Sequence, residues 1–295
     1  MADAIVSILV SGLVLGSLYA LMASGLSMVW TTLGIFNFAH GVSMTVGAYV
    51  AYEIYQRLGP EIWVGYSIVL ALLVMVVVGA AFEFLLIRPF YGRDDMVLVT
   101  IMTTLAGLTF LENGVLAIWG PRLKQLEPLI PGNVSYGLVN ISMQELIVIV
   151  LAPLILLALF YVLNHTQVGR AIRAVGQNQK SAQLIGIPVK RMFLMSFGAA
   201  AALAGLAGML LGGIRLMTPT MGTDPLMKAL IVVIFGGLGS IGGSIGAAYA
   251  IGFLEAVLVF TIGIYWTPSM LFLVMVLVLL VKPQGLFSSR TSSTL

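Results

Sequence analysis

The sequence is poor in charge and contains no cysteine. Only 8% of its 295 residues are charged, 60% are hydrophobic, and the mean hydropathy is +1.10. A soluble domain carries roughly a quarter charged residues, so this composition indicates an integral membrane protein. Because backbone polar groups find no water inside a bilayer, such a chain is expected to be helical. The absence of cysteine excludes disulfides, thiolate metal sites and cysteine catalysis.

Motifs for nucleotide binding and hydrolysis are either absent or lie in an unsuitable context. No GxxxxGK[ST] sequence occurs, so the chain has no P-loop for ATP. Gly237-Leu-Gly239-Ser-Ile-Gly242 matches a dinucleotide pattern, and Gly242-Gly-Ser244-Ile-Gly246 matches a nucleophile elbow. Both patterns require a strand followed by a helix, whereas here they join two apolar segments. We interpret them as closely packed turns, with a membrane hydrolase built on Ser244 kept as a third alternative.

Nine apolar segments predict an all-α, polytopic membrane protein with eight or nine transmembrane segments, forming a single transmembrane domain over residues 1–295. Each segment except 226–239 is long enough to cross roughly 30 Å of hydrocarbon. The short one is either a half-helix or part of a broken crossing. The segments are 5–30, 35–55, 62–87, 96–119, 141–163, 192–214, 226–239, 243–263 and 268–281.

The positions of lysine and arginine predict the orientation, because cytoplasmic loops are enriched in both. Nine crossings with the N-terminus outside place Arg88, Arg93, the loop 165–191, Lys282 and Arg290 on the cytoplasmic side. The basic residues lie in loops between spans, so the net charge of +3 reflects orientation and contact with lipid rather than binding of nucleic acid.

The proline- and glycine-rich stretch 120–140 is then expected to be an external loop that meets a partner.

The cytoplasmic loop 165–191 carries five basic residues and no acidic one. Its inner part predicts a short helix with Asn178 as its N-cap and Gly186 directly after its last turn. Ala182 and Ile185 are expected to form a small apolar face on this helix. Charge alone leaves two interpretations open: a solvated loop that orients the protein, or a docking surface for a cytoplasmic partner.

Ionisable side chains inside spans are candidates for a solute path, because burying each costs roughly 2.5–3.5 kcal/mol at the bilayer centre. Glu112 and Asn113 lie in the outer half of the fourth segment, and Glu255 lies near the middle of the eighth. Each carboxylate is either an interhelical hydrogen-bonding group or a contact for the solute.

A polar cluster also opens the second segment, where Asn37-Phe-Ala-His40-Gly is followed by Ser43 and Thr45. Helical spacing places Asn37 on one face with either His40 or Thr45. These residues either satisfy a helix terminus near the interface or form part of a path or gate.

Four stretches of the sequence resemble the integral-membrane permease of a binding-protein-dependent ABC importer of the branched-chain amino acid (Liv) type. They are GLVLGSLYALMASGLSMVW…LGIFNFAHG (12–41), VGRAIRAVGQNQKSAQLIGIPVKRM (168–192), FGGLGSIGGSIGAAYAIGFLEA (235–256) and VLLVKPQGLF (278–287). The resemblance covers almost the full length, with the four stretches in the expected order. Importers of this type have two permeases, and this chain resembles the shorter one more than the longer one. The run WTTLGIFNF (30–38) departs from it by being bulkier and richer in threonine.

The resemblance implies a division of labour among separate subunits. A periplasmic binding protein delivers the solute, this chain and a homologous second permease form the path, and two cytoplasmic ATPases bind ATP and Mg²⁺. This subunit is therefore expected to be no enzyme and to need no cofactor. Its loop would couple to an ATPase, with Arg170 and Arg173 as electrostatic anchors and Ala182 and Ile185 packing. The implied coupling residues are Gly169, Arg170, Arg173, Ala174, Asn178, Ala182, Ile185 and Gly186.

The predicted function is a multi-pass permease of a bacterial inner membrane. It would import branched-chain amino acids or related small solutes such as urea and amides. The alternative is a stand-alone secondary transporter coupled to an ion gradient, which should show broken-helix ion sites near the midplane.

Overall fold

The computed structural model describes residues 2–59, 61–136, 139–282 and 285. Within these ranges the chain forms eleven α-helices and one two-stranded hairpin. The helices are α1 (Ala2–Leu33), α2 (His40–Leu58), α3 (Val64–Phe82), α4 (Met96–Trp119), α5 (Met143–His165), α6 (Gln167–Gln177), α7 (Gln179–Leu184), α8 (Val189–Gly212), α9 (Thr223–Gly236), α10 (Ile241–Ile262) and α11 (Thr267–Val281). A π-helical turn, Glu83–Ile87, and a short 3-10 turn, Arg88–Phe90, extend α3. Arg290 and part of the motif 278–287 lie outside the described residues.

Each of the nine predicted apolar segments is helical, which confirms a polytopic helical membrane protein. Among the described residues, six helices are long and apolar enough to cross a membrane: α1, α3 with its extension, α4, α5, α8 and α10. The segment predicted to be too short for a full crossing corresponds to α9, which has 14 residues. α11 has 15 residues. α2 has 19 residues but is more polar. The number of crossings therefore stays a prediction.

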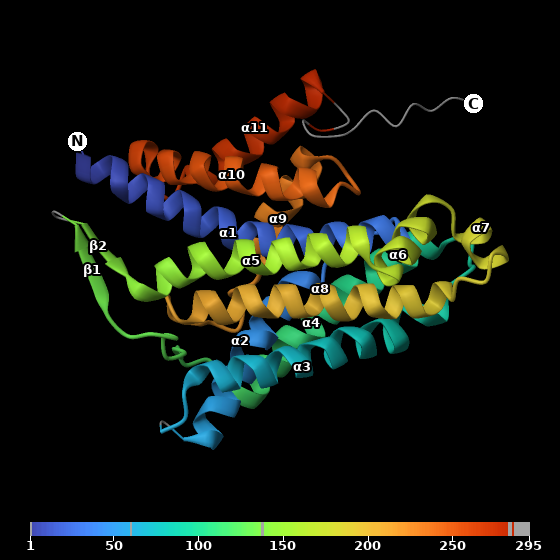
Figure 1. Ribbon diagram of the computed structural model, residues 1–295, viewed down its shortest axis with the longest axis horizontal. Helices are drawn as coiled ribbons and strands as arrows, with labels where there is room; N and C mark the ends of the chain where they lie inside the picture. Colours follow the sequence, from blue (N-terminus) through green and yellow to red (C-terminus); the bar gives the residue numbers. More distant parts are fainter. Residues whose placement is uncertain (1, 60, 137–138, 283–284, 286–295) are drawn as a thin grey trace.

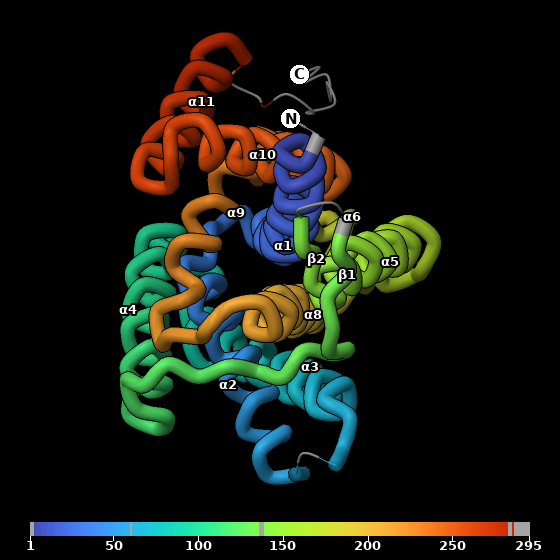
Figure 2. The backbone as a smooth tube through the Cα atoms, turned by 90° about the vertical axis from the view of Figure 1, so that its left-hand side faces the viewer, coloured from blue at the N-terminus to red at the C-terminus, as the bar shows by residue number. Residues whose placement is uncertain are grey.

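α1 lies at the centre of the bundle. It makes its most extensive contacts with α10 and also packs against α8, α5 and α9. Figure 2 looks along the bundle and shows α10 above α1, α5 beside it and α8 below it, with α2, α3 and α4 farther out. α6 and α7 lie together at one end, and the hairpin and the N-terminal end of α1 lie at the other (Figure 1).

Glycines bring the central helices into backbone contact. A Cβ at Gly252 of α10 would overlap the main-chain nitrogen of Gly16 in α1, and one at Gly47 of α2 would overlap Gly205 of α8. In lipid there is little hydrophobic drive between helices, so close packing through small residues supplies much of the association energy. These two crossings attach α10 to α1 and α2 to α8.

The predicted external loop carries secondary structure of its own. β1 (Asn133–Tyr136) pairs antiparallel with β2 (Val139–Ser142). The preceding stretch pairs with the connection after α8, because Lys124 and Met217 exchange main-chain hydrogen bonds of 3.3 and 2.7 Å. The buried amide of Gln144 reaches the carbonyl of Leu210 at 3.2 Å. These contacts attach the described part of this region to α8 and to the connection that follows it.

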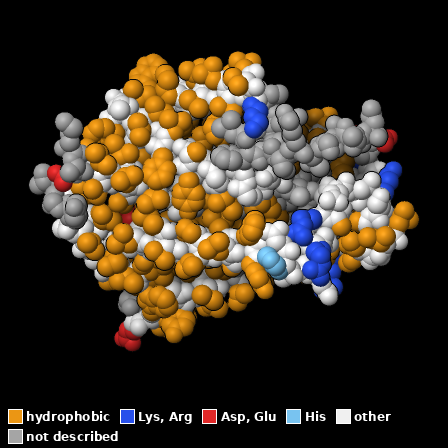
Figure 3. Space-filling model, turned by 45° about the horizontal axis from the view of Figure 1, so that its top comes forward, with side chains coloured by type: hydrophobic (Ala, Val, Ile, Leu, Met, Phe, Trp, Pro, Cys, Tyr) orange, Lys and Arg blue, Asp and Glu red, His pale blue; other side chains and the backbone are white. Residues whose placement is uncertain are grey.

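Polarity is distributed unevenly over the surface. Figure 3 shows apolar side chains over most of the visible helices, and most of the cationic ones on this face gather toward the α6–α7 end. This is the distribution expected of a bundle surrounded by lipid with one basic end in water.

Candidate functional site

The corner between α5 and α6 is held by short local contacts. The hydroxyl of Thr166 accepts from the main-chain nitrogen of Gly169 at 3.2 Å, which caps α6. A Cβ at Gly169 would overlap the carbonyl of Leu163, so only glycine fits there. Arg173 donates from Nη1 to the carbonyl of Leu163 and to Oδ1 of Asn164, the latter at 2.9 Å. Arg173 therefore donates to hydrogen-bond acceptors at the end of α5, and its guanidinium does not project freely into solvent.

The short helix α7 has the N-cap that the sequence predicts and is followed by the predicted glycine. Oδ1 of Asn178 accepts from the nitrogen of Ser181 at 2.9 Å, and Gly186 follows the helix with a φ of +84°. A positive φ favours glycine because it has no Cβ to clash with the backbone. Local capping chemistry is sufficient to define this helix, because both signals act within a few residues.

The apolar face predicted for α7 is wrong. Ala182 is only 3% exposed and packs inside the protein, whereas Ile185 is 75% exposed. The exposed apolar neighbour of Ile185 is Leu184, at 87%, which the sequence analysis missed. The prediction assigns both residues to one face of the helix. α7 ends at Leu184, so Ile185 follows the helix and does not share the buried face that carries Ala182.

Two other predicted coupling residues lie on α6. Arg170 is exposed, with Nη1 3.4 Å from the carbonyl of His165, and Ala174 is half-buried. Arg170 thus stays at the surface of the α6–α7 end.

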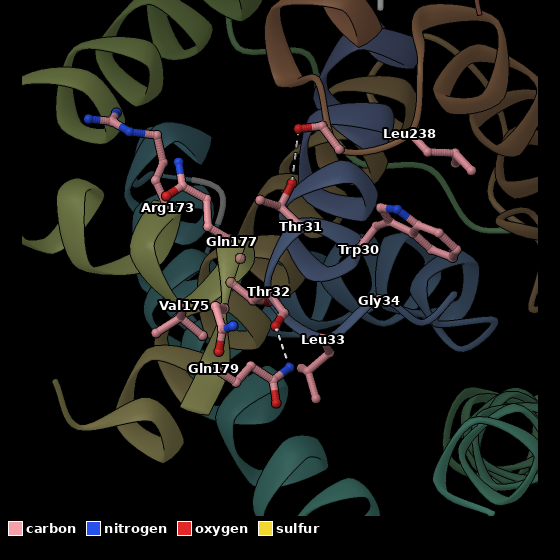
Figure 4. Close-up of a pocket in the computed structure, with 13 residues that line it drawn as sticks. Trp30, Thr31, Thr32, Leu33, Gly34, Arg173, Val175, Gln177, Gln179 and Leu238 are labelled. Carbon is pink, nitrogen blue, oxygen red and sulfur yellow. Dashed lines mark hydrogen bonds between the residues drawn. The ribbon is translucent and has the colours of Figure 1, made fainter. Parts of the chain in front are cut away.

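The α6–α7 element is tied to the end of α1 around a pocket of about 730 Å³. Figure 4 shows the side-chain amide of Gln179 directed at Thr32, where Nε2 donates to the carbonyl at 3.1 Å. On the other side of the pocket, the hydroxyl of Thr31 donates to the carbonyl of Gly239 at 3.2 Å. The guanidinium of Arg173 extends away toward α5. α1 is therefore joined directly to both the α6–α7 element and the turn before α10.

The polar residues around the start of α2 make contacts inside the protein. Asn37 precedes the helix, and its Oδ1 accepts from the nitrogen of Ala39 at 3.1 Å. Nε2 of His40 lies 3.0 Å from the carbonyl of Met22 in α1, and the hydroxyl of Thr45 accepts from the nitrogen of Gly222 at 3.1 Å.

The remaining hydroxyl, that of Ser43, donates to the carbonyl of Ala39 at 3.1 Å. In this conformation the group positions α2 against α1 and the loop before α9, and its role in a path stays a prediction.

Glu112 and Asn113 lie apart from Glu255. Oε1 of Glu112 accepts from the hydroxyl of Thr223 at 3.0 Å, which links α4 to the start of α9. The amide of Asn113 donates to the carbonyl of Thr109 on its own helix at 2.8 Å. Neither residue lines the two hollows that adjoin Glu255.

Glu255 belongs to a cluster of charges between three helices. Its Oε1 lies 2.6 Å from Nζ of Lys228 in α9, and its Oε2 accepts from the hydroxyl of Tyr19 in α1 at 2.7 Å. Nζ of Lys228 also lies 2.8 Å from Oδ2 of Asp224. The side chains of Lys228 and Glu255 are only 12% and 7% exposed. Two charges are thus removed from water and paired.

Sequence analysis identified Glu255 as a candidate but did not identify Lys228 or Asp224. Asp224 and Lys228 are four residues apart, at the start of an otherwise apolar segment. That spacing predicts an ion pair on one helix face, and it would have identified both residues. Tyr19 carries no comparable signal, because it is one aromatic residue in a long apolar helix.

Two hollows adjoin this cluster. One of about 590 Å³ lies between α1, α10 and the start of α11, and one of about 190 Å³ lies between α1, α2, α8 and α9. Both are lined by Arg215, Asp224, Lys228 and Glu255. The smaller hollow has apolar walls that include Met22 and Met44. The arrangement can therefore hold a molecule that has both charged and apolar parts.

The hydroxyl of Ser244, the residue of the hydrolase alternative, donates to the carbonyl of Ser240 at 3.0 Å within the first turn of α10. The surrounding chain is helical, without the strand that a nucleophile elbow requires. The GxSxG match is a helix start with close packing.

Comparison with known proteins identifies the family. Residues 8–280 match the family described as "Branched-chain amino acid transport system / permease component". The high-affinity branched-chain amino acid transport system permease protein BraD of Pseudomonas aeruginosa is 30% identical over 289 residues, covering 94% of each chain. The corresponding protein LivH of Escherichia coli is 32% identical over 286 residues, covering 94% of this chain and 93% of that one. LivH of Salmonella typhimurium is 31% identical over 288 residues, with the same coverage.

This match decides among the three classes of protein that the sequence left open. Permeases of this family are multi-pass transport subunits without an ATPase domain or a cofactor of their own, and they work with ATPase and binding-protein partners. The predicted permease is thereby confirmed over the secondary transporter and the hydrolase. The chain belongs to the permease family of branched-chain amino acid ABC transport systems.

Proposed function

We propose that this permease pairs with a homologous second permease and two cytoplasmic ATPases, and that the assembly imports branched-chain amino acids or related small solutes. A periplasmic binding protein would deliver the solute. The relatives named as high-affinity branched-chain amino acid permeases, matched along nearly their whole length, support this class of solute. We further propose that the whole chain acts as one permease domain with nine crossings, its α6–α7 end in the cytoplasm.

The observation that carries this proposal is the pair of exposed apolar side chains at the tip of a basic, water-facing element. Leu184 and Ile185 are 87% and 75% exposed, and the α6–α7 element also carries the exposed cationic residues Arg170 and Lys180. An apolar tip on a polar segment suits insertion into a groove of another protein, because burial there removes the apolar surface from water. We assign the tip to the ATPase interface.

The connections of α7 provide a route for the motion that drives transport. A shift of α7 would act on α1 through the bond between Gln179 and Thr32. α1 would move α10 with it, because Gly16 and Gly252 are in backbone contact. Rigid movement of packed helices between two arrangements is a common form of switching. ATP-driven closure of the ATPase pair would thus open the path alternately to each side.

Substitution of both tip residues tests this assignment. The variant L184E/I185E should insert and fold normally but should lose the ATPases on co-purification, because two charges would face an apolar groove. The matched control is L123E on the opposite end, where Leu123 is 59% exposed, and it should retain them. Retention of the ATPases with normal uptake in L184E/I185E would refute the docking site.

The energy source is tested separately in proteoliposomes. Uptake by the intact complex should require ATP and the binding protein and should continue after an uncoupler collapses the ion gradient. Uptake that stops with the uncoupler while ATP stays high would contradict an ATP-driven importer.

A further inference from the structure

The cluster around Lys228 has a balanced arrangement of charge. Two cations, Arg215 and Lys228, and two anions, Asp224 and Glu255, line the same two hollows. The inner pair, Lys228 and Glu255, is buried, and it is further held by Tyr19 and Asp224. A ligand with one positive and one negative charge adds to such a cluster without changing its net charge.

The outer pair is open to a ligand. Asp224 is 65% exposed at its side chain, although it contacts Lys228. In the part of the chain that the structure describes, the guanidinium of Arg215 makes no side-chain hydrogen bond or ion pair, and it is exposed. Arg215 is therefore an available donor for a carboxylate, and Asp224 is an available acceptor for an ammonium group.

The walls of the smaller hollow are apolar away from these charges. Leu18, Met22, Met44 and Leu211 line it and are supplied by three helices, α1, α2 and α8. Methionine is flexible and polarisable, so it adapts to apolar groups of differing shape. A branched or unbranched aliphatic side chain suits these walls, whereas a charged one would be left without a partner.

We propose that the smaller hollow binds an α-amino acid zwitterion with an uncharged apolar side chain. Its carboxylate would contact Arg215, its ammonium group would contact Asp224, and its side chain would lie against Met22 and Met44. Lys228 and Glu255 act as positioning residues that hold Asp224 in place. This inference rests on the proposed function, which supplies the class of solute, and it adds a binding site within the membrane path.

Cysteine protection tests the site directly, because the natural chain has no cysteine. Leu216 lines the smaller hollow and is 55% exposed, so L216C offers a thiol at its mouth. The intact complex, without binding protein, is treated with a maleimide, and the labelled permease chain is identified by its mass. L-leucine at about ten times its half-protecting concentration should slow labelling about tenfold by mass action. The control L123C, at an exposed position outside the hollow, should be labelled at the same rate with and without leucine.

Two partial ligands test the zwitterion. 4-Methylpentanoate lacks the ammonium group and 3-methylbutylamine lacks the carboxylate, so each should need a concentration about tenfold higher or more for equal protection. R215Q and D224N, each combined with L216C, should raise the half-protecting concentration of leucine by a similar factor. Their elution on size exclusion should be unchanged, because both residues are exposed.

Absence of protection by leucine would overturn the site, and so would equal protection by leucine and 3-methylbutylamine, which would indicate only an apolar hollow. ATP-driven leucine uptake by the unmodified complex is measured in parallel. Uptake without protection overturns the site alone, whereas protection without uptake supports the site and overturns the proposed function.

Discussion

The side-chain amide of Gln179 donates to the main-chain carbonyl of Thr32 at 3.1 Å, which joins the first residue of α7 to the end of α1. These residues are 147 positions apart in the sequence. The bond connects the element proposed to meet the ATPases with the helix at the centre of the bundle.

Loss of this bond should weaken coupling. In Q179A, solute moved per ATP hydrolysed should fall about fivefold, because one hydrogen bond is worth about 1 kcal/mol in the balance between two states. ATP hydrolysis itself should continue, since the ATPases are untouched. Q183A changes an exposed residue of the same helix and should leave the ratio as it is. An unchanged ratio in Q179A would show that α7 transmits motion by another contact.

Removal of Lys228 should destabilise the bundle. In K228M, Glu255 remains buried with only the hydroxyl of Tyr19, and leaving a buried charge without its partner costs about 3–5 kcal/mol. The midpoint of thermal unfolding in detergent should therefore fall clearly. The double variant K228M/E255Q should recover part of the loss, because the second substitution removes the unpaired charge.

The matched control for the buried ion pair is the exposed ion pair between Arg57 and Glu53. An exposed ion pair stabilises a protein by about 0–1 kcal/mol. R57Q should therefore leave the unfolding midpoint nearly unchanged. Equal midpoints for K228M and R57Q would indicate that water reaches Glu255.

The contact between α1 and α10 should not tolerate a side chain. G252V places methyl groups where the backbone of Gly16 lies, so the helices must separate, at a cost of about 1–3 kcal/mol or more. G242V is on the same helix, at an exposed position with open space around it, and should be tolerated. Fluorescence-detected size exclusion should show a loss of the monodisperse peak for G252V only. A normal peak for both would mean that this crossing contributes little.

Arg173 should act through the corner between α5 and α6. R173A removes the bonds to the carbonyl of Leu163 and to Asn164, and a hydrogen bond from a charged donor is worth about 1.5–3 kcal/mol. Hydrogen exchange of residues 163–169 should therefore become faster, whereas K180A, which removes an exposed cation on α7, should leave it close to that of the unmodified chain. Normal exchange together with lost coupling in R173A would instead support a direct anchor on the ATPase.

Local signals in the sequence were sufficient for the elements of this protein. Long apolar runs predict helices because the backbone must bond to itself in lipid, and all nine runs are helical. Asn178 and Gly186 define α7 because caps act over three or four residues. The stretches around Asn37 and Gly169 indicated the family before any contact was known.

Only the tertiary structure decided which residues meet. Glu255 is 236 positions from Tyr19 and 27 from Lys228, and their contact depends on how α1, α9 and α10 rotate and cross. The same packing buried Ala182 and left Ile185 exposed. An apolar run determines that a helix forms. Which face of that helix packs against its neighbours depends on how two helix surfaces fit together, as Gly16 of α1 fits Gly252 of α10. The sequence of one helix does not contain that information by itself.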